Sequence, residues 1–202
     1  MPSHLDTREN AYRDAMTGGR IKLVLLLLVC AAPVIASYVT FYFLKPEGRV
    51  NYGTLIEPAR LLPDVTLATL DGRPYKLSGL RGKWVLLTLD GGACAAACPD
   101  KLFKMRQLRT MQGKERERIE RAWLITDDEK LSTMLIREHD DMKFLRGADA
   151  ALMREFPNDG APSDHIYLVD PLGHLILRYP RDANPARISR DIGRLLKYSR
   201  IG

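Results

Sequence analysis

The sequence "WVLLTLDGGACAAACPDKL", residues 84–102, gives the clearest indication of the fold. It begins with a continuous apolar run, Trp84–Leu89, which is typical of a strand buried on both faces. It continues to Pro99, a residue that favours the first turn of a helix. Cys94 and Cys98 lie in the loop between the two. Because open α/β sheets place their sites at this end of a strand, the two cysteines are the first candidates for chemistry.

The cysteine spacing leaves three uses open. Side chains at i and i+4 of a helix share one face, so a small rearrangement brings the two sulfurs within bonding distance. The amino end of the helix also stabilises a thiolate, and the three alanines between Cys94 and Cys98 leave the sulfurs accessible. Two thiolates equally suit a soft ion such as Cu(I). A permanent disulfide or a pair of buried thiols is the purely structural interpretation.

The elements around the cysteine loop predict a thioredoxin-like α/β fold. A hairpin is expected at Asp71-Gly72 and a second hairpin at Pro171–Gly173. The remaining expected elements are a strand at 121–126, a helix at 127–140, a strand at 142–147, a small helix at 148–156 and an amphipathic helix at 184–200. With the strand and helix that flank the cysteines, the order is β-α-β-α-β-β-α.

Composition bounds the chain to one domain and an appendage. The protein has 202 residues, of which 46% are hydrophobic, and a formal net charge of +6. The basic residues alternate with acidic ones, as in "GKERERIERAW", and no aromatic platform accompanies them. This pattern favours solvated helix faces and gives no indication of nucleic-acid binding.

The appendage is predicted to be a membrane anchor. Leu23–Leu44 contains no charge and, as a helix, would span about 33 Å, enough to cross a bilayer. The run is longer than a typical signal-peptide core, and no convincing cleavage site follows it. Cys30 lies inside the span and is interpreted as a small apolar residue. Residues 45–60 are rich in Pro, Gly and polar residues and are interpreted as a linker, so the thioredoxin-like domain would be 61–202.

Charge asymmetry predicts the orientation of the anchor. The positive residues before the span outnumber those close behind it: Arg8, Arg13, Arg20 and Lys22 against Lys45 and Arg49. Residues 1–22 are therefore expected to form a cytoplasmic tail. The protein would be a single-pass protein of a bacterial inner membrane, and its C-terminal domain would lie in the periplasm, where thiols are exposed to oxidation.

Three stretches resemble the Sco/SenC family of cytochrome c oxidase assembly proteins: residues 62–89, "CAAACPDKLFKMRQL" at 94–108 and "YLVDPLG" at 167–173. Members of that family are membrane-anchored thioredoxin-fold copper chaperones with a C-x-x-x-C-P motif after the first buried strand. The resemblance covers most of residues 61–200 and marks the chain as a divergent member. It implies that Cys94 and Cys98 deliver copper to the binuclear copper centre of the oxidase, or reduce its cysteines. The implied partner is the oxidase subunit that carries this centre.

The third copper ligand departs from the family pattern. In the family it is a histidine five residues before the tyrosine of the "YL-x-D-x-x-G" strand, and this chain has Pro162 there. The nearest histidine is His165, which an odd offset of three residues places on the other side of an extended strand unless the preceding loop differs. Copper ligation by Cys94, Cys98 and His165 is one hypothesis. The alternatives are a copper-independent thiol-disulfide oxidoreductase, with His165 as a strand-end residue, and a non-catalytic subunit that uses the fold for docking.

Overall fold

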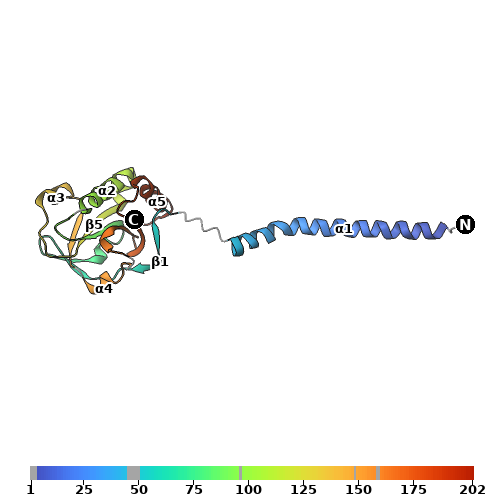
Figure 1. Ribbon diagram of the computed structural model, residues 1–202, viewed down its shortest axis with the longest axis horizontal. Helices are drawn as coiled ribbons and strands as arrows, with labels where there is room; N and C mark the ends of the chain where they lie inside the picture. Colours follow the sequence, from blue (N-terminus) through green and yellow to red (C-terminus); the bar gives the residue numbers. More distant parts are fainter. Residues whose placement is uncertain (1–3, 45–50, 96, 148, 158–159) are drawn as a thin grey trace. The chain divides into compact units, whose positions relative to one another are not determined.

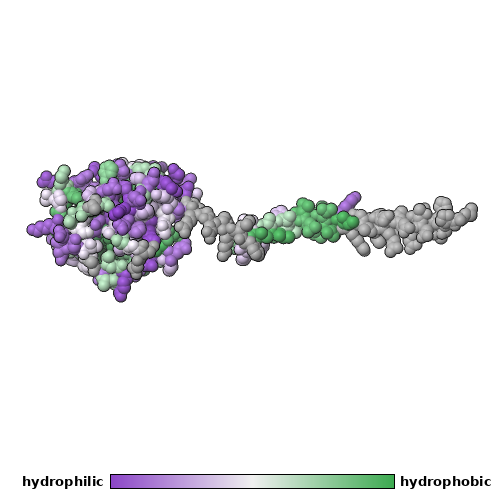
Figure 2. All heavy atoms as spheres, viewed as in Figure 1, coloured by the Kyte–Doolittle hydropathy of each residue, from purple (hydrophilic) through white to green (hydrophobic). Residues whose placement is uncertain are grey.

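The computed structural model describes residues 4–44, 51–95, 97–147, 149–157 and 160–202, which fall into two units, Met1–Arg49 and Val50–Gly202. In the first unit, helix α1 (His4–Val39) is followed by a π-helical turn, Thr40–Leu44. The segment Ile21–Tyr42, which covers the second half of α1 and part of this turn, is long and apolar enough to cross a membrane. It forms the green band of Figure 2. The chain therefore carries one N-terminal apolar helix, as the sequence predicts.

The second unit is built on one mixed sheet (Figure 1). In the described part of the chain, the sheet has eight strands in the order β1-β8-β7-β4-β5-β6-β2-β3. Strand β4 pairs in parallel with β5 and antiparallel with β7, so it lies in the middle of the sheet. The strands are β1 (Thr54–Leu61), β2 (Thr66–Thr69), β3 (Pro74–Lys76), β4 (Trp84–Asp90), β5 (Ile119–Ile125), β6 (Lys143–Arg146), β7 (His165–Val169) and β8 (His174–Pro180).

The sheet separates the hydrophobic core into two layers, and helices cover these layers. One layer packs under α2 (Cys98–Met111) and α5 (Pro185–Tyr198), and the other packs near α4 (Ala150–Met153). Helix α3 (Thr133–Glu138) follows β5, and short 3-10 turns occur at Leu77–Leu80, Gly113–Arg118 and Pro162–Asp164. This arrangement is a thioredoxin-like α/β fold, with both predicted hairpins present as β2–β3 and β7–β8.

Alternation along the central strands assigns each side chain to a layer. In β7, Ile166 and Leu168 belong to the layer that holds the cysteines, α2 and α5. Tyr167 and Val169 belong to the opposite layer, near α4. The same period runs through β4, where Leu86 faces the cysteine layer. This division determines which polar side chains can reach the cysteine loop.

The predicted linker is partly a strand. Residues 54–60 form most of β1, which pairs with β8 at the edge of the sheet; residues 45–50 lie outside the described part of the chain. Only Ile56 of this strand is buried, so the sequence shows no hydrophobic alternation there. An edge strand also tolerates a proline, here Pro58. Because β1 belongs to the sheet, the second unit begins before residue 61.

The helix predicted at 127–140 is shorter in the structure. It covers only Thr133–Glu138, and Asp127 explains why its first part is not helical. The Asp127 carboxylate accepts hydrogen bonds from the backbone N–H groups of Gly92 and Glu129. These bonds hold residues 127–129 against the cysteine loop in a non-helical conformation.

A buried arginine lies in β5. The Arg121 guanidinium bonds the Asp141 carboxylate and lies 3.4 Å from Nδ1 of His139, which follows α3. Burial lowers the pKa of Arg121 to about 10, with smaller contributions from the neighbouring Arg109 and Arg106 charges. Arg121 is therefore still charged at neutral pH. Burial and the Arg121 charge also lower the pKa of His139, which favours its neutral form.

Candidate functional site

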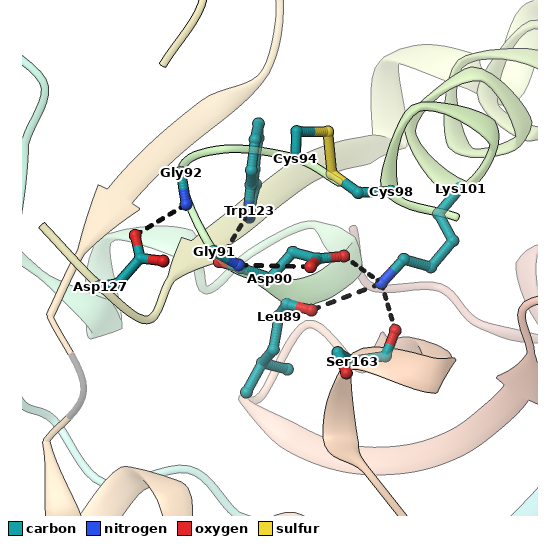
Figure 3. Close-up of a disulfide and its surroundings, with 10 residues drawn as sticks. All are labelled: Leu89, Asp90, Gly91, Gly92, Cys94, Cys98, Lys101, Trp123, Asp127 and Ser163. Atoms are coloured by element: carbon teal, nitrogen blue, oxygen red, sulfur yellow. Dashed lines mark hydrogen bonds and ion pairs between the residues drawn. A yellow bond between two sulfur atoms is a disulfide. The ribbon is translucent and has the colours of Figure 1, made fainter. Parts of the chain in front are cut away.

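Cys94 and Cys98 are joined by a disulfide at the carboxyl end of β4 (Figure 3). Their Cα atoms are 5.0 Å apart, and Cys98 is the first residue of α2. Pro99 occupies the first turn of this helix, where its missing N–H leaves no intrahelical bond unmade. The strand-to-helix loop therefore holds both cysteines where the sequence predicts them.

The two cysteines differ in exposure. Cys94 is 7% exposed and Cys98 is 1% exposed, while the adjacent Ala93 and Ala95 are exposed. Both cysteines are largely buried, and the slightly higher exposure of Cys94 favours it over Cys98 as the point of attack by an external thiolate. Cys98 then becomes the leaving sulfur, at the amino end of α2, where the helix dipole favours negative charge.

The glycines before the cysteines permit a close approach of two loops. A Cβ atom on Gly92 would lie closer than 3.0 Å to the backbone oxygen of Glu129. A Cβ atom on Gly91 would collide in the same way with the Asp127 carboxylate. Cys94 itself has a φ of 46°, a left-handed conformation that is uncommon for a residue other than glycine. Larger side chains at Gly91 or Gly92 would therefore not fit without a shift of the neighbouring segment.

A buried ion pair, which the sequence analysis did not find, lies beside the disulfide. Lys101 Nζ is 2.7 Å from an Asp90 carboxylate oxygen, and the side chains are 1% and 19% exposed. The ammonium group also donates to the backbone oxygens of Leu89 and Ser163 (Figure 3). Lys101 thus joins the end of β4, the start of α2 and the turn before β7. Removing one partner of such a buried pair costs about 3–5 kcal/mol.

Two sequence signals mark this pair in retrospect. Asp90 is the one charged residue of strand β4, and its even position places it on the same side as Leu86, towards α2. Lys101 follows Cys98 by three residues, so the two lie on the same helix face. Lysine on a helix is ordinarily exposed, and only the neighbouring carboxylate makes its burial tolerable.

His165 lies on the other side of the sheet from the cysteines. It begins β7 in step with Tyr167, and the two ring centroids are 5.9 Å apart. Its Nδ1 atom lies 3.4 Å from the Ala161 oxygen. Within the described ranges, no three or more His, Cys, Asp or Glu side chains form a group that could hold a metal ion. The structure does not bring His165 to the cysteines, and its ligand role stays a prediction.

The position where the family resemblance expects a ligand is also visible. Pro162 begins the 3-10 turn Pro162–Asp164 and carries no donor side chain. The Ser163 backbone oxygen in the same turn accepts a hydrogen bond from Lys101. In this chain the contact between the turn and α2 is therefore a hydrogen bond from the Lys101 ammonium group to the Ser163 carbonyl oxygen.

Comparison with known families assigns the domain. The family model described as "transmembrane-like, thioredoxin-like, C-terminal domain" matches residues 84–199, more than half of the chain. The chain belongs to this family. The match includes both cysteines, Lys101 and the β7–β8 hairpin. No curated protein matches the sequence.

Solved structures of Sco/SenC proteins share this family member's fold. Yeast Sco1 with copper bound is 20% identical with a TM-score of 0.55, over 69% of this chain and 90% of that one. A SCO1/SenC family lipoprotein from Bacillus anthracis is 19% identical with a TM-score of 0.53, over 69% and 98%. BsSco, a member of the Sco family of cytochrome c oxidase assembly proteins, is 18% identical with a TM-score of 0.53, over 72% and 99%. At such identities the likeness concerns the fold.

The close approach at Gly92 predicts that Gly92→Ala destabilises the domain by about 1–3 kcal/mol, since an inserted methyl group must displace the 127–129 backbone. Urea unfolding of residues 50–202 measures the effect. Gly193→Ala is the control: Gly193 lies within helix α5, and its Cβ atom would lie 3.4 Å from the Gln112 side-chain oxygen, an ordinary van der Waals distance. The control should be neutral or stabilising by up to about 1 kcal/mol. Equal stability of Gly92→Ala and the wild type would contradict the packing described.

Proposed function

We propose that this protein is a membrane-anchored assembly factor that carries out thiol-disulfide exchange through Cys94 and Cys98. The observation that carries the proposal is the Cys94–Cys98 disulfide in the strand-to-helix loop, with Cys94 the more exposed residue. The His165 ring on the opposite side of β7 favours exchange over a three-ligand copper site.

In the proposed exchange, the target protein carries a disulfide and this protein begins with both thiols reduced. The Cys94 thiolate attacks one target sulfur, the target S–S bond breaks, and the released target sulfur takes up a proton. A mixed disulfide now joins Cys94 to the target. Cys98 then gives up its proton and attacks the Cys94 sulfur, the Cys94–Cys98 bond forms, and the second target sulfur leaves as a thiolate that takes up a proton. Two electrons and the two thiol protons pass to the target, and the reverse sequence oxidises a target dithiol.

The proposed target is the pair of cysteines at the binuclear copper centre of cytochrome c oxidase. The resemblance to the Sco/SenC family and the fold shared with BsSco, a member of a family of cytochrome c oxidase assembly proteins, support this choice. Such a centre binds copper through its sulfurs only when they are reduced, because the thiolate is the ligand. A reductant of these cysteines would therefore prepare the subunit for its metal.

A trapped intermediate tests the exchange. In a Cys30→Ala background, Cys98→Ser should accumulate a mixed disulfide between Cys94 and the oxidase subunit, because the resolving thiol is missing. Cys94→Ser should accumulate much less, because Cys98 is 1% exposed. Non-reducing electrophoresis of membranes from oxidase-producing cells, with mass spectrometry of the adduct, gives the measurement. If neither variant forms a disulfide-linked adduct with the oxidase subunit, the proposed target is wrong.

Copper transfer is the second candidate function. Two cysteines with Cα atoms 5.0 Å apart offer, when reduced, a pair of soft ligands, and Cu(I) tolerates two-coordinate binding. Yeast Sco1 has the same fold and has been solved with copper bound. In this role copper is cargo, held by Cys94 and Cys98, and His165 would join only if its ring left the Tyr167 side of β7.

Metal titration separates the ligand sets. The reduced protein should bind Cu(I), and Cys94→Ser should abolish this binding because one sulfur cannot provide the linear pair. His165→Ala should change the Cu(I) and Cu(II) affinities by less than about twofold, since the imidazole lies on the other side of the strand. Competition with a chromophoric chelator measures both affinities. A loss of about tenfold or more in Cu(II) affinity for His165→Ala would establish His165 as the third ligand.

We also infer that the apolar helix is a retained anchor and that the C-terminal domain is exported to the periplasm. The positive charges before the span support this orientation. An alkaline phosphatase reporter fused after residue 202 should be active, whereas the same reporter fused after residue 22 should be inactive. The opposite pattern would place the cysteines in the cytoplasm and would remove the oxidising compartment from the proposal.

A further inference from the structure

The Asp90–Lys101 pair is the most deeply buried ion pair beside the disulfide among the described residues. The other charged groups at this end of α2 and at the facing turn are more exposed and paired with one another. Lys104 pairs with Asp100, and Arg181 pairs with Asp164. Solvent screens these outer pairs, whereas the Lys101 charge acts through the protein interior, where electrostatic interactions are stronger.

Opening the disulfide creates a charge next to this pair. When an external thiolate attacks Cys94, the S–S bond breaks and Cys98 keeps the bonding electrons as a thiolate. Cys98 is buried, so water stabilises the new charge poorly. Lys101 lies one helical turn along α2 on the same face as Cys98, and Asp90 ends the strand that leads into the cysteine loop.

We propose that Lys101 and Asp90 set how readily the Cys94–Cys98 disulfide opens: Lys101 stabilises the negative charge on the released Cys98 sulfur, and Asp90 opposes it. The inference rests on the proposed thiol-disulfide exchange and identifies two residues that tune it. Neither residue binds a ligand or attacks a sulfur. Both change the electrostatic potential at the Cys98 sulfur. An external dithiol supplies the two electrons and two protons, and becomes a disulfide.

Removing the Lys101 charge and removing the Asp90 charge should shift the dithiol–disulfide equilibrium in opposite directions. Lys101→Met removes the positive charge, so the equilibrium with a reference dithiol should move towards the protein disulfide by about tenfold. Asp90→Asn removes the negative charge and leaves the ammonium group uncompensated, so the equilibrium should move towards the dithiol form. A merely structural role predicts the same direction for both, since each substitution loosens the same contacts between β4 and α2.

Two further variants separate charge from hydrogen bonding. Lys101→Gln keeps a donor for the Leu89 and Ser163 carbonyls but loses the charge, so it should behave like Lys101→Met. Lys101→Arg keeps the charge and should stay within about twofold of the wild type. If Lys101→Gln restores the wild-type equilibrium, the role of Lys101 is structural and the proposal is wrong. Lys101→Gln also decides the question if Lys101→Met does not fold.

The experiment uses the full chain in detergent, with Cys30→Ala so that two cysteines remain. The protein is equilibrated with mixtures of reduced and oxidised dithiothreitol at about pH 9, above the usual thiol pKa of about 8.5. Acid quenching, alkylation and mass spectrometry then give the fraction reduced. Opposite shifts for the Asp90 and Lys101 variants support the proposal, and shifts in one direction or none overturn it. If the wild-type disulfide does not equilibrate at all, the proposed exchange itself falls.

Discussion

The two-residue period of the central strands is the constraint on which the site depends. Because successive side chains point to opposite faces, β4 directs Asp90 towards α2, and β7 directs His165 away from it. A one-residue change of register would exchange these roles. The sheet leaves little freedom for such a change, since β4 is bonded on both sides, to β5 and β7.

The loop that follows this strand is tightly packed, and Cys94 is the less buried of its two cysteines. Gly91 and Gly92 let the cysteine loop lie against residues 127–129. The Asp127 carboxylate links the two segments by accepting a hydrogen bond from the Gly92 N–H. Lys101 fastens the other side, to the turn before β7. Rigid neighbours on both sides favour a loop that positions Cys94 for attack and keeps Cys98 as the buried partner.

The sequence predicted the features that follow from local pattern and missed those that depend on tertiary partners. The apolar run of β4, the hairpins and the cysteine spacing are local signals, and each led to the correct element. The linker interpretation was wrong for residues 54–60, because an edge strand with one buried side chain has no visible period. The burial of Lys101 and Arg121 was not predicted, because it depends on Asp90 and Asp141, which lie on other segments of the chain.

Cys94 and Cys98 are proposed to form a reversible couple within the folded domain, independent of His165. Carbon-13 NMR of the Cys94 and Cys98 Cβ atoms, followed through a series of dithiol-to-disulfide ratios, tests it most directly. Both residues should lose intensity at the disulfide positions and gain it at the thiol positions with one midpoint, while the backbone and His165 ring signals stay unchanged. Cysteine signals that remain at disulfide positions until the domain unfolds would contradict it.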